Sequence, residues 1–215
     1  MKKITLLFSA ALMMACQSAT VPETAERDCW NGLSSDGTTL EKTFVTSGRK
    51  AQIVGQQSLA FQDMGGHVPD EMGGIWMGRI KVADGFWMNV KGDDGTTEEL
   101  RALRMTVFPH YNEFDLGTLQ NGIKVTSQQF ASDKEEGVAI SYIFSNHLTL
   151  DFLLNSDISP AWYSSTGDRE NAEDIITWDA DARCFKGKDK DHDWYSAWTT
   201  DHPSTRQESG IEGVK

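Results

Sequence analysis

The sequence predicts a mainly β protein: one antiparallel domain whose strands form a meander of barrel-like or half-barrel shape, with a β-sandwich as the alternative. Three observations predict it. Apolar and polar residues alternate over several short runs, as in half-buried strands. The dipeptides Asp84-Gly85 and Asn121-Gly122 each lie between two such runs, where they favour tight turns. No low-complexity or repeated stretch divides residues 29–205, so we expect one domain there.

Alternating runs follow one another along this domain. In chain order, the expected strand regions are 39–46, 50–61, 75–91, 113–130, 138–144, 148–154, 173–179 and 182–187. Because two of these regions contain a turn, we expect about nine or ten short strands in all.

Residues 75–91 carry the clearest hairpin pattern. Alternation puts Ile80 and Val82 on one face before Asp84-Gly85. After the dipeptide, the residues that share a face are Phe86, Met88 and Val90. Asp-Gly between two such runs predicts a hairpin, because both turn residues must accept a positive φ.

Asn121-Gly122 predicts a second hairpin inside 113–130. The next two alternating runs, 138–144 and 148–154, are separated by only three residues. Sequential strands joined by short connections usually pair with each other, so we expect these two to be antiparallel neighbours.

Residues 96–105 do not fit the strand pattern throughout. Thr96 and Glu99 have the spacing of a helix capping box. However, Leu103, Met105 and Val107 continue an alternation of period two. We therefore expect a first turn of helix or loop, followed by strand.

The N-terminal residues predict an export signal. Lys2 and Lys3 precede 12 mostly apolar residues, 4–15, which is the length of a secretory signal and too short to span a bilayer of roughly 30 Å. Neither Ala15 nor Ala19 ends a good A-x-A cleavage site, because Met13 and Gln17 occupy the outer small positions. The segment from Met13 to Cys16 resembles the lipobox of bacterial lipoproteins, although Met stands where Leu and a small residue are commoner.

This resemblance implies that Cys16 becomes the lipidated first residue and that the protein is exported and lipid-anchored in the bacterial envelope. Gln17, rather than Asp, implies the outer membrane, facing the periplasm. The resulting division is a signal peptide (1–15), the lipidated cysteine with a flexible tether (16–28), the β-rich domain (29–205) and a loose tail (206–215).

Lipidation leaves Cys29 and Cys184 as the remaining cysteines. In an oxidising compartment such a pair is expected to form a disulfide, and this one would join the two ends of the domain. The alternative is two unpaired, buried cysteines.

The charge of the chain limits its partners. The formal net charge is −12, and it becomes −14 when Lys2 and Lys3 leave with the signal peptide. Phosphate backbones and anionic headgroups repel such a surface, so we expect no nucleic-acid partner and membrane contact only through the lipid anchor.

No motif predicts a reaction, and we expect neither catalytic residues nor a cofactor. Ser47 and Lys50 match S-x-x-K, but Gly48 is a poor residue at the start of the helix that this motif requires. Asp189, Asp191 and Asp193 are weak candidates for a calcium site, because the positions of an EF-hand loop that need Gly and a bidentate acid hold Trp194 and Thr200.

Seven tryptophans are the most unusual feature of the composition. Large aromatics fill cores and staple hairpins, and they also line ligand pockets. Gly73-Gly74-Ile75-Trp76 is similar to the opening strand of lipocalin-like barrels. The candidate ligand-binding residues are Trp76, Phe86, Met88 and Val90. Our leading hypothesis is a non-catalytic envelope lipoprotein that binds or passes a small apolar ligand. The alternatives, in order, are a structural or protein-interaction module, a carbohydrate-facing module that uses exposed tryptophans, and an enzyme.

Overall fold

The computed structural model describes residues 32–61, 72–91, 96–160 and 173–202. Within these ranges the chain forms sixteen strands and one 3-10 helix, η1 (Gly37–Glu41). The predicted mainly β, antiparallel class is confirmed, with more strands than the sequence pattern indicated. No helix in the described ranges is long and apolar enough to cross a bilayer.

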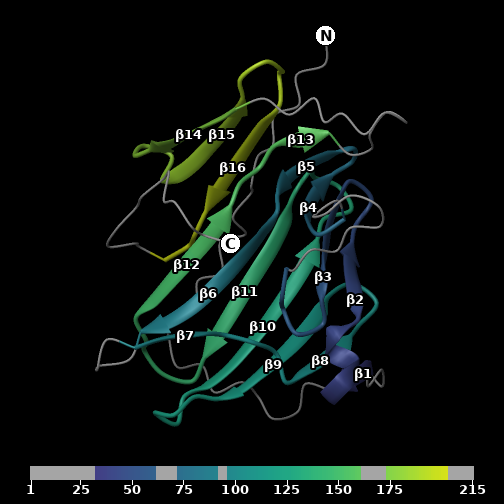
Figure 1. The fold of residues 1–215 in the computed structure, drawn as a ribbon, viewed down its shortest axis with the longest axis vertical. Helices are drawn as coiled ribbons and strands as arrows, with labels where there is room; N and C mark the ends of the chain where they lie inside the picture. Colours follow the sequence, from purple (N-terminus) through teal and green to yellow (C-terminus); the bar gives the residue numbers. More distant parts are fainter. Residues whose placement is uncertain (1–31, 62–71, 92–95, 161–172, 203–215) are drawn as a thin grey trace.

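A five-stranded antiparallel sheet forms the first layer of the fold (Figure 1). Its strands, in spatial order, are β1 (Leu33–Asp36), β8 (Arg104–Val107), β9 (Asn112–Thr118), β10 (Lys124–Ala131) and β11 (Val138–Phe144). Along β10, buried residues alternate with more exposed ones, and Val125 and Ser127 belong to the buried set. This period of two gives the sheet one core-facing side.

Two further sheets form the second layer. The first has the order β13 (Ser159–Pro160), β5 (Ile80–Ala83), β4 (Gly74–Met77), β3 (Ala51–Gln56) and β2 (Thr43–Ser47). The second has the order β12 (Leu150–Asn155), β6 (Gly85–Lys91) and β7 (Thr97–Glu99). Only Asp84 separates β5 from β6, and its N–H donates to the carbonyl of Asn155 at 2.9 Å. The two sheets are therefore continuous along one bent pair of strands.

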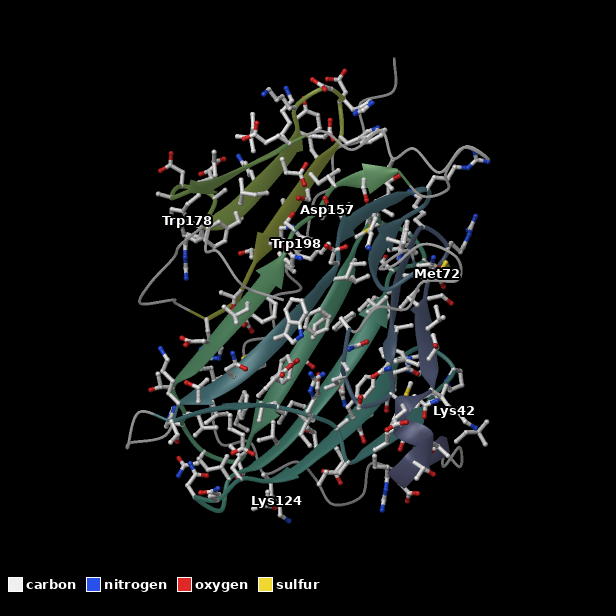
Figure 2. All side chains as sticks on the ribbon, viewed as in Figure 1. Lys42, Met72, Lys124, Asp157, Trp178 and Trp198 are labelled. Atoms are coloured by element: carbon white, nitrogen blue, oxygen red, sulfur yellow. The ribbon has the colours of Figure 1, made fainter. Side chains whose placement is uncertain are left out.

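The core lies between these layers. Phe44 of β2 and Phe114 of β9 meet edge to face, with ring centroids 5.2 Å apart. A small sheet, β14 (Asp174–Asp179), β15 (Cys184–Asp189) and β16 (Tyr195–Thr199), lies at the upper left of Figure 1. Trp198 of this sheet, labelled in Figure 2, belongs to the main core. The four sheets of the described residues form no closed barrel, and the arrangement fits the sandwich or meander expectation.

The predicted hairpin at Asp84-Gly85 is wrong. β5 pairs with β4 and β13, whereas β6 pairs with β12 and β7, so the dipeptide is a bend in one long strand. Gly85 does not have a positive φ. A Cβ at Gly85 would lie 2.6 Å from the side chain of Phe61, so close packing explains the glycine better than turn geometry does.

The tight turn of this region lies instead at Gly78-Arg79. Met77 pairs with Ile80 across it, and Gly78 has a φ of 63° while Arg79 is not among the residues with positive φ. Glycine at the first central position is the preference of a type II′ hairpin turn. The sequence pattern concealed this turn because Gly78-Arg79 is not one of the common hairpin dipeptides.

The predicted hairpin at Asn121-Gly122 is confirmed. β9 and β10 pair on either side of it, Gly122 has a φ of 81°, and the side chain of Asn121 accepts a hydrogen bond from the Ile123 N–H at 3.2 Å. The expected pairing of 138–144 with 148–154 is wrong. β11 pairs with β10, and β12 pairs with β6 in the other layer. The short connection between them is therefore an arch from one layer to the other.

Residues 96–105 form no helix. β7 begins at Thr97 and ends at Glu99, and β8 begins at Arg104. The segment between them carries the chain from the β6 sheet to the first layer. Leu100 and Ala102 are buried there, so two apolar side chains anchor the crossing in the core.

Candidate functional site

The candidate site is an apolar face on β6 and β12, which we call the β6–β12 face. Residues directly opposite each other on an antiparallel pair point to the same side. The face consists of three such cross-strand pairs: Val90 with Leu150, Met88 with Phe152, and Phe86 with Leu154. The predicted common face of Phe86, Met88 and Val90 is confirmed, since all three lie in or against the main core.

Phe152 is the unusual member of this face. Its ring lies 6.1 Å from that of Phe86, between centroids, and Phe86 is fully enclosed in the core. Phe152 is nevertheless 49% exposed. Its neighbours Met88, Leu150 and Leu154 are only partly buried. The core-facing side of this layer thus continues into an apolar surface that reaches solvent.

Trp76 does not belong to this face. It forms a separate buried cluster with Val54, and its indole N–H donates to the carbonyl of Met72 at 3.1 Å. The Lys81 ammonium lies 5.7 Å from the centroid of the Trp76 ring. Three of the four predicted ligand-binding residues therefore share one face, and the fourth has a packing role elsewhere.

Facing this layer across the core, the first sheet carries buried polar side chains. The amide of Asn112 donates to Thr46 Oγ1 at 2.6 Å, and Thr46 in turn donates to Gln129 Oε1 at 3.3 Å. Gln129 and Ser127 are both 0% exposed. Among the described residues, Gln129 Nε2 has no hydrogen-bond partner.

Tyr142 of β11 lies directly opposite Ser127 on the same side of the sheet. Burial is the main cause that raises the pKa of Tyr142 far above 10, and Glu99 contributes to the rise. The side-chain hydrogen bond with Ser127 and the charge of Arg101 act in the opposite direction and lower the pKa. The phenol therefore stays protonated at all physiological pH values and can donate a hydrogen bond.

Arg101 brings a cation to this polar group. Its Nη2 pairs with Glu99 Oε1 at 2.9 Å. Its Nη1 is buried and, within the described part of the chain, has no hydrogen-bond partner. Arg101 thus has one guanidinium nitrogen neutralised by a carboxylate and one still able to donate.

A second titratable cluster lies where the small sheet meets the second layer. Burial raises the pKa of Asp174 to about 6, the hydrogen bond from the Ile158 N–H opposes the rise, and Asp157, Asp189 and Asp84 add to it. That hydrogen bond to Asp174 Oδ2 is 2.6 Å long. Asp174 and Asp189 are also directly opposite each other on β14 and β15, a pairing of like charges that opposes sheet formation.

Lys81 is the buried cation at this junction. It is 2% exposed and forms an ion pair with Asp84 Oδ1. The other carboxylate oxygen of Asp84 accepts a hydrogen bond from the side chain of Asn155 at 3.1 Å. Lys81 therefore brings positive charge to a junction that is otherwise dominated by carboxylates.

The structure does not join the weak metal candidates into a site. Asp189 Oδ1 accepts the backbone N–H groups of Asp191 and His192 and contacts the ring of His192 at 2.8 Å. Asp191 and Asp193 are exposed. No group of three or more ligating side chains among the described residues has the geometry to hold a metal ion. The carboxylate of Asp189 instead orders the turn that follows it.

Of the three cysteines named in the predictions, only Cys184 lies within the described residues. Cys184 is buried, whereas Cys16 and Cys29 lie outside the described residues. The disulfide and the lipidation therefore stay predictions, as do the signal peptide, the tether and the C-terminal tail.

Sequence reasoning missed Ser127, Tyr142 and Arg101. The sequence did contain one indication of them, which is that polar residues stand at core-facing positions of a strand. Along β10 the buried positions run Val125, Ser127, Gln129 and Ala131, so two polar residues occupy places where alternation predicts apolar ones. Arg101 gave no such signal, because the crossing between β7 and β8 has no regular period.

Searches against protein-family models, curated proteins and solved structures found no match, so the site is interpreted from its own geometry.

Proposed function

We propose that the protein is a non-catalytic envelope lipoprotein whose β domain binds a small apolar ligand on the β6–β12 face. The single observation that carries the proposal is Phe152, a core-facing aromatic that is half-exposed beside partly buried neighbours. A contiguous apolar patch that reaches solvent is more typical of a binding site than a single exposed apolar residue is. A ligand lying on this face would complete the burial.

The energy available from this face is moderate. Covering the exposed half of Phe152 would remove about 100 Å² of apolar surface from water, which corresponds to about 2.5 kcal/mol. Partial coverage of Met88, Leu150 and Leu154 would add to this. The cost of immobilising the ligand reduces the total, so we expect weak binding of a purely apolar molecule, with an affinity that is micromolar at best.

Phe152→Ala tests the site, and Phe130→Ala is the matched control. Phe130 is 43% exposed but lies on the opposite side of the first sheet from the core, since its neighbour Gln129 points inward. We expect the parent protein and Phe130→Ala to bind an environment-sensitive apolar dye equally, and Phe152→Ala to bind it at least about tenfold more weakly with little loss of stability. Absence of dye binding by the parent, or equal weakening in both variants, would contradict the proposal.

The protein-interaction module remains the second candidate. Phe130 and Ile143 are both exposed, at 43% and 52%, on the outer side of β10 and β11. Native mass spectrometry of the protein extracted from its own cells separates the two candidates. A retained small molecule supports ligand binding, and a retained protein supports the interaction module.

The location rests on the resemblance of residues 13–16 to a lipobox. We expect Cys16→Ser to release the protein from membranes without unfolding the domain, because the tether lies outside the β core. Persistence of the variant in membranes after carbonate washing would exclude acylation as the anchor. For the lipidated protein, density-gradient fractionation should place it with the outer membrane, and recovery from the inner membrane would contradict the sorting prediction.

A further inference from the structure

We propose that the small sheet formed by β14, β15 and β16 is held against the second layer in a pH-dependent way, by a single proton that Asp174 and Asp189 share. We call these two residues the carboxyl pair. The docked arrangement is the one that the structure shows, and loss of the shared proton loosens it. The inference concerns a conformational change and does not depend on the proposed ligand site.

The two members of the carboxyl pair are cross-strand neighbours. Asp174 of β14 and Asp189 of β15 are directly opposite each other in the antiparallel register, so their side chains lie on the same side of the small sheet. Cβ atoms at such positions are about 4.5–5.5 Å apart, a separation at which two carboxyl groups can share a hydrogen bond. Asp189 is 0% exposed, and Asp174 is partly buried.

One oxygen of each carboxyl group lacks a partner. Asp174 Oδ1 and Asp189 Oδ2 are buried, and neither has a hydrogen-bond partner among the described residues. Two ionised carboxylates offer only acceptors, so they repel each other and cannot form a hydrogen bond. When the pair holds one proton, one carboxyl oxygen can donate to the other. A shared proton therefore satisfies both oxygens at once.

The other two oxygens connect the carboxyl pair to its surroundings. Asp174 Oδ2 accepts the N–H of Ile158 at 2.6 Å. Ile158 is fully buried and directly precedes β13 of the second layer, so this hydrogen bond links the small sheet to that layer. Asp189 Oδ1 contacts the ring of His192 and accepts backbone N–H groups of the turn after β15.

Carboxylates from several elements surround Asp174. Burial is the main cause that raises the pKa of Asp174 to about 6, and the hydrogen bond from the Ile158 N–H opposes the rise. The remaining causes of the rise are three other carboxylates, Asp157, Asp189 and Asp84. Because this pKa is higher in the docked sheet than in water, docking is most stable below about pH 4 and loses stability as the pH rises to about 6.

The nearby lysines have acidic partners of their own. Lys81 of β5 pairs with Asp84, and Lys190, which follows β15, pairs with the exposed Glu173 at 3.2 Å. Neither of these ion pairs includes a member of the carboxyl pair. His192 contacts Asp189 through Nδ1 at 2.8 Å, on the oxygen that Asp174 does not need. The proton is thus the positive charge that the two unpartnered oxygens can still gain.

Side chains, rather than strand pairing, attach the small sheet to the rest of the fold. Among the described strands, β14, β15 and β16 pair only with one another (Figure 1). Phe185 and Trp198 pack against the main core. Ile158 Cδ1 would lie 3.3 Å from a Cβ at Gly187, so Ile158 packs closely on the sheet. The small sheet can therefore loosen as a unit while its own strand pairing stays intact.

Hydrogen exchange of the Ile158 N–H, measured by NMR in the intact protein, tests the inference. This amide is bonded to Asp174 only while the sheet is docked. After correction for the intrinsic effect of pH on exchange, we expect its protection factor to fall about tenfold between pH 4.5 and pH 7.5. The rise in pKa from 3.8 to about 6 sets an upper limit of about a hundredfold, which solvent screening of the half-exposed Asp174 reduces. The N–H of Asp84, bonded to Asn155 at 2.9 Å within the second layer, should change by less than about twofold.

Asp174→Asn imitates the protonated residue. Its side chain can accept from the Ile158 N–H and donate to Asp189, so protection at Ile158 should stay at the acid value at both pH values. Glu173→Gln is the matched control, because it neutralises the exposed acid next to Asp174 and should keep the parent pH dependence. Asp189→Asn should move the midpoint of the change to lower pH, because it removes one charge that raises the pKa of Asp174.

Each outcome decides for or against the carboxyl pair. Equal protection at Ile158 at both pH values in the parent protein would overturn the inference, and so would a pH dependence that Asp174→Asn retains. A midpoint that Asp189→Asn leaves unchanged would show that no proton is shared. If calcium chloride at pH 7.5 restored the acid level of protection, a cation rather than a proton would satisfy the pair, and the inference would be wrong. A pH dependence that Asp174→Asn abolishes, Asp189→Asn shifts and Glu173→Gln retains supports it.

Discussion

Lys81→Met is the substitution that most directly tests the electrostatics of the junction between the small sheet and the second layer. Lys81 is 2% exposed, and its ammonium pairs with Asp84. Methionine keeps most of the length of the side chain but removes its charge. The negative charge of Asp84 would then remain close to Asp174, which also interacts with Asp157 and Asp189.

The expected cost follows from the burial of the two partners. Removing one partner of a buried ion pair typically costs about 3–5 kcal/mol. Asp84 is 28% exposed and keeps its hydrogen bond from Asn155, so water and the amide partly solvate the remaining carboxylate. We therefore expect a loss near the lower end, about 3 kcal/mol in the free energy of unfolding at pH 7.5. Lys81→Met combined with Asp84→Asn should lose less than Lys81→Met alone, because the carboxylate that Lys81 pairs with is then also neutral.

Urea unfolding of the parent, both single variants and the double variant measures these values and their coupling. Lys124→Met is the control, because Lys124 is an exposed lysine of β10 (labelled in Figure 2) and should cost less than about 0.5 kcal/mol. The loss in Lys81→Met should also shrink at pH 4, where the carboxyl groups begin to take up protons. If the single losses simply add in the double variant, the ion pair does not stabilise the junction and the reasoning is refuted.

Three further predictions concern other parts of the fold. Gly74→Ala should lower the free energy of unfolding by about 3 kcal/mol or more, because Gly74 has a φ of 117° and a Cβ would lie 2.1 Å from a backbone carbonyl oxygen of β5. Gly78→Ala, where a Cβ would meet nothing within 4 Å, should cost only about 1 kcal/mol. Equal losses in urea unfolding would contradict this prediction. Asp174→Asn should raise the free energy of unfolding by about 1 kcal/mol at pH 7.5, after allowance for solvent screening of this half-exposed group, and the gain should vanish near pH 4. The sign follows because the pKa of Asp174 is raised in the folded state, so its ionised carboxylate destabilises the folded protein above about pH 6. Below about pH 4 the carboxyl group is protonated in both the folded and the unfolded state, and the substitution then has no effect through charge. A gain that does not depend on pH would show that the charge is not the cause. Finally, if Cys29 and Cys184 form a disulfide, reduction should lower the melting temperature of the exported protein. In Cys184→Ser, reduction should leave the melting temperature unchanged. The same result for the parent protein would exclude the disulfide.

Strands could be predicted from the sequence more reliably than their partners. Alternation located most of the strands, and Asn121-Gly122 identified a hairpin, because both signals are local properties of the chain. Asp84-Gly85 has the same local signal but forms a bend. The difference arises from residues that are remote in sequence. The side chain of Asn155 donates a hydrogen bond to the side chain of Asp84, and Phe61 packs where a Cβ at Gly85 would lie. No short-range pattern contains that information.

The candidate site shows the same division. The common face of Phe86, Met88 and Val90 follows from alternation alone, and the structure confirms it. The partner strand β12 could not be predicted, because proximity in sequence favours β11 as its neighbour. Arg101 pairs with Glu99, and its charge influences the pKa of Tyr142, because the chain crosses between the layers at this point. Tertiary contacts of this kind leave no periodic trace in the sequence.

The long bent pair formed by β5–β6 and β12–β13 has a consequence for the order of folding. The side chains of Asp84 and Asn155, which meet across it, are 71 residues apart, and Ser34 of β1 bonds to Thr106 across 72 residues. Pairings over such distances close large loops and make folding slow. While the chain is being synthesised, the edge of β6 that pairs with β12 stays unpaired until β12 has been made. Phe86 and Met88 of β6 remain exposed during this time. The surface that we assign to ligand binding is thus among the last to assemble, and a nascent chain halted before residue 150 should be prone to aggregate through it.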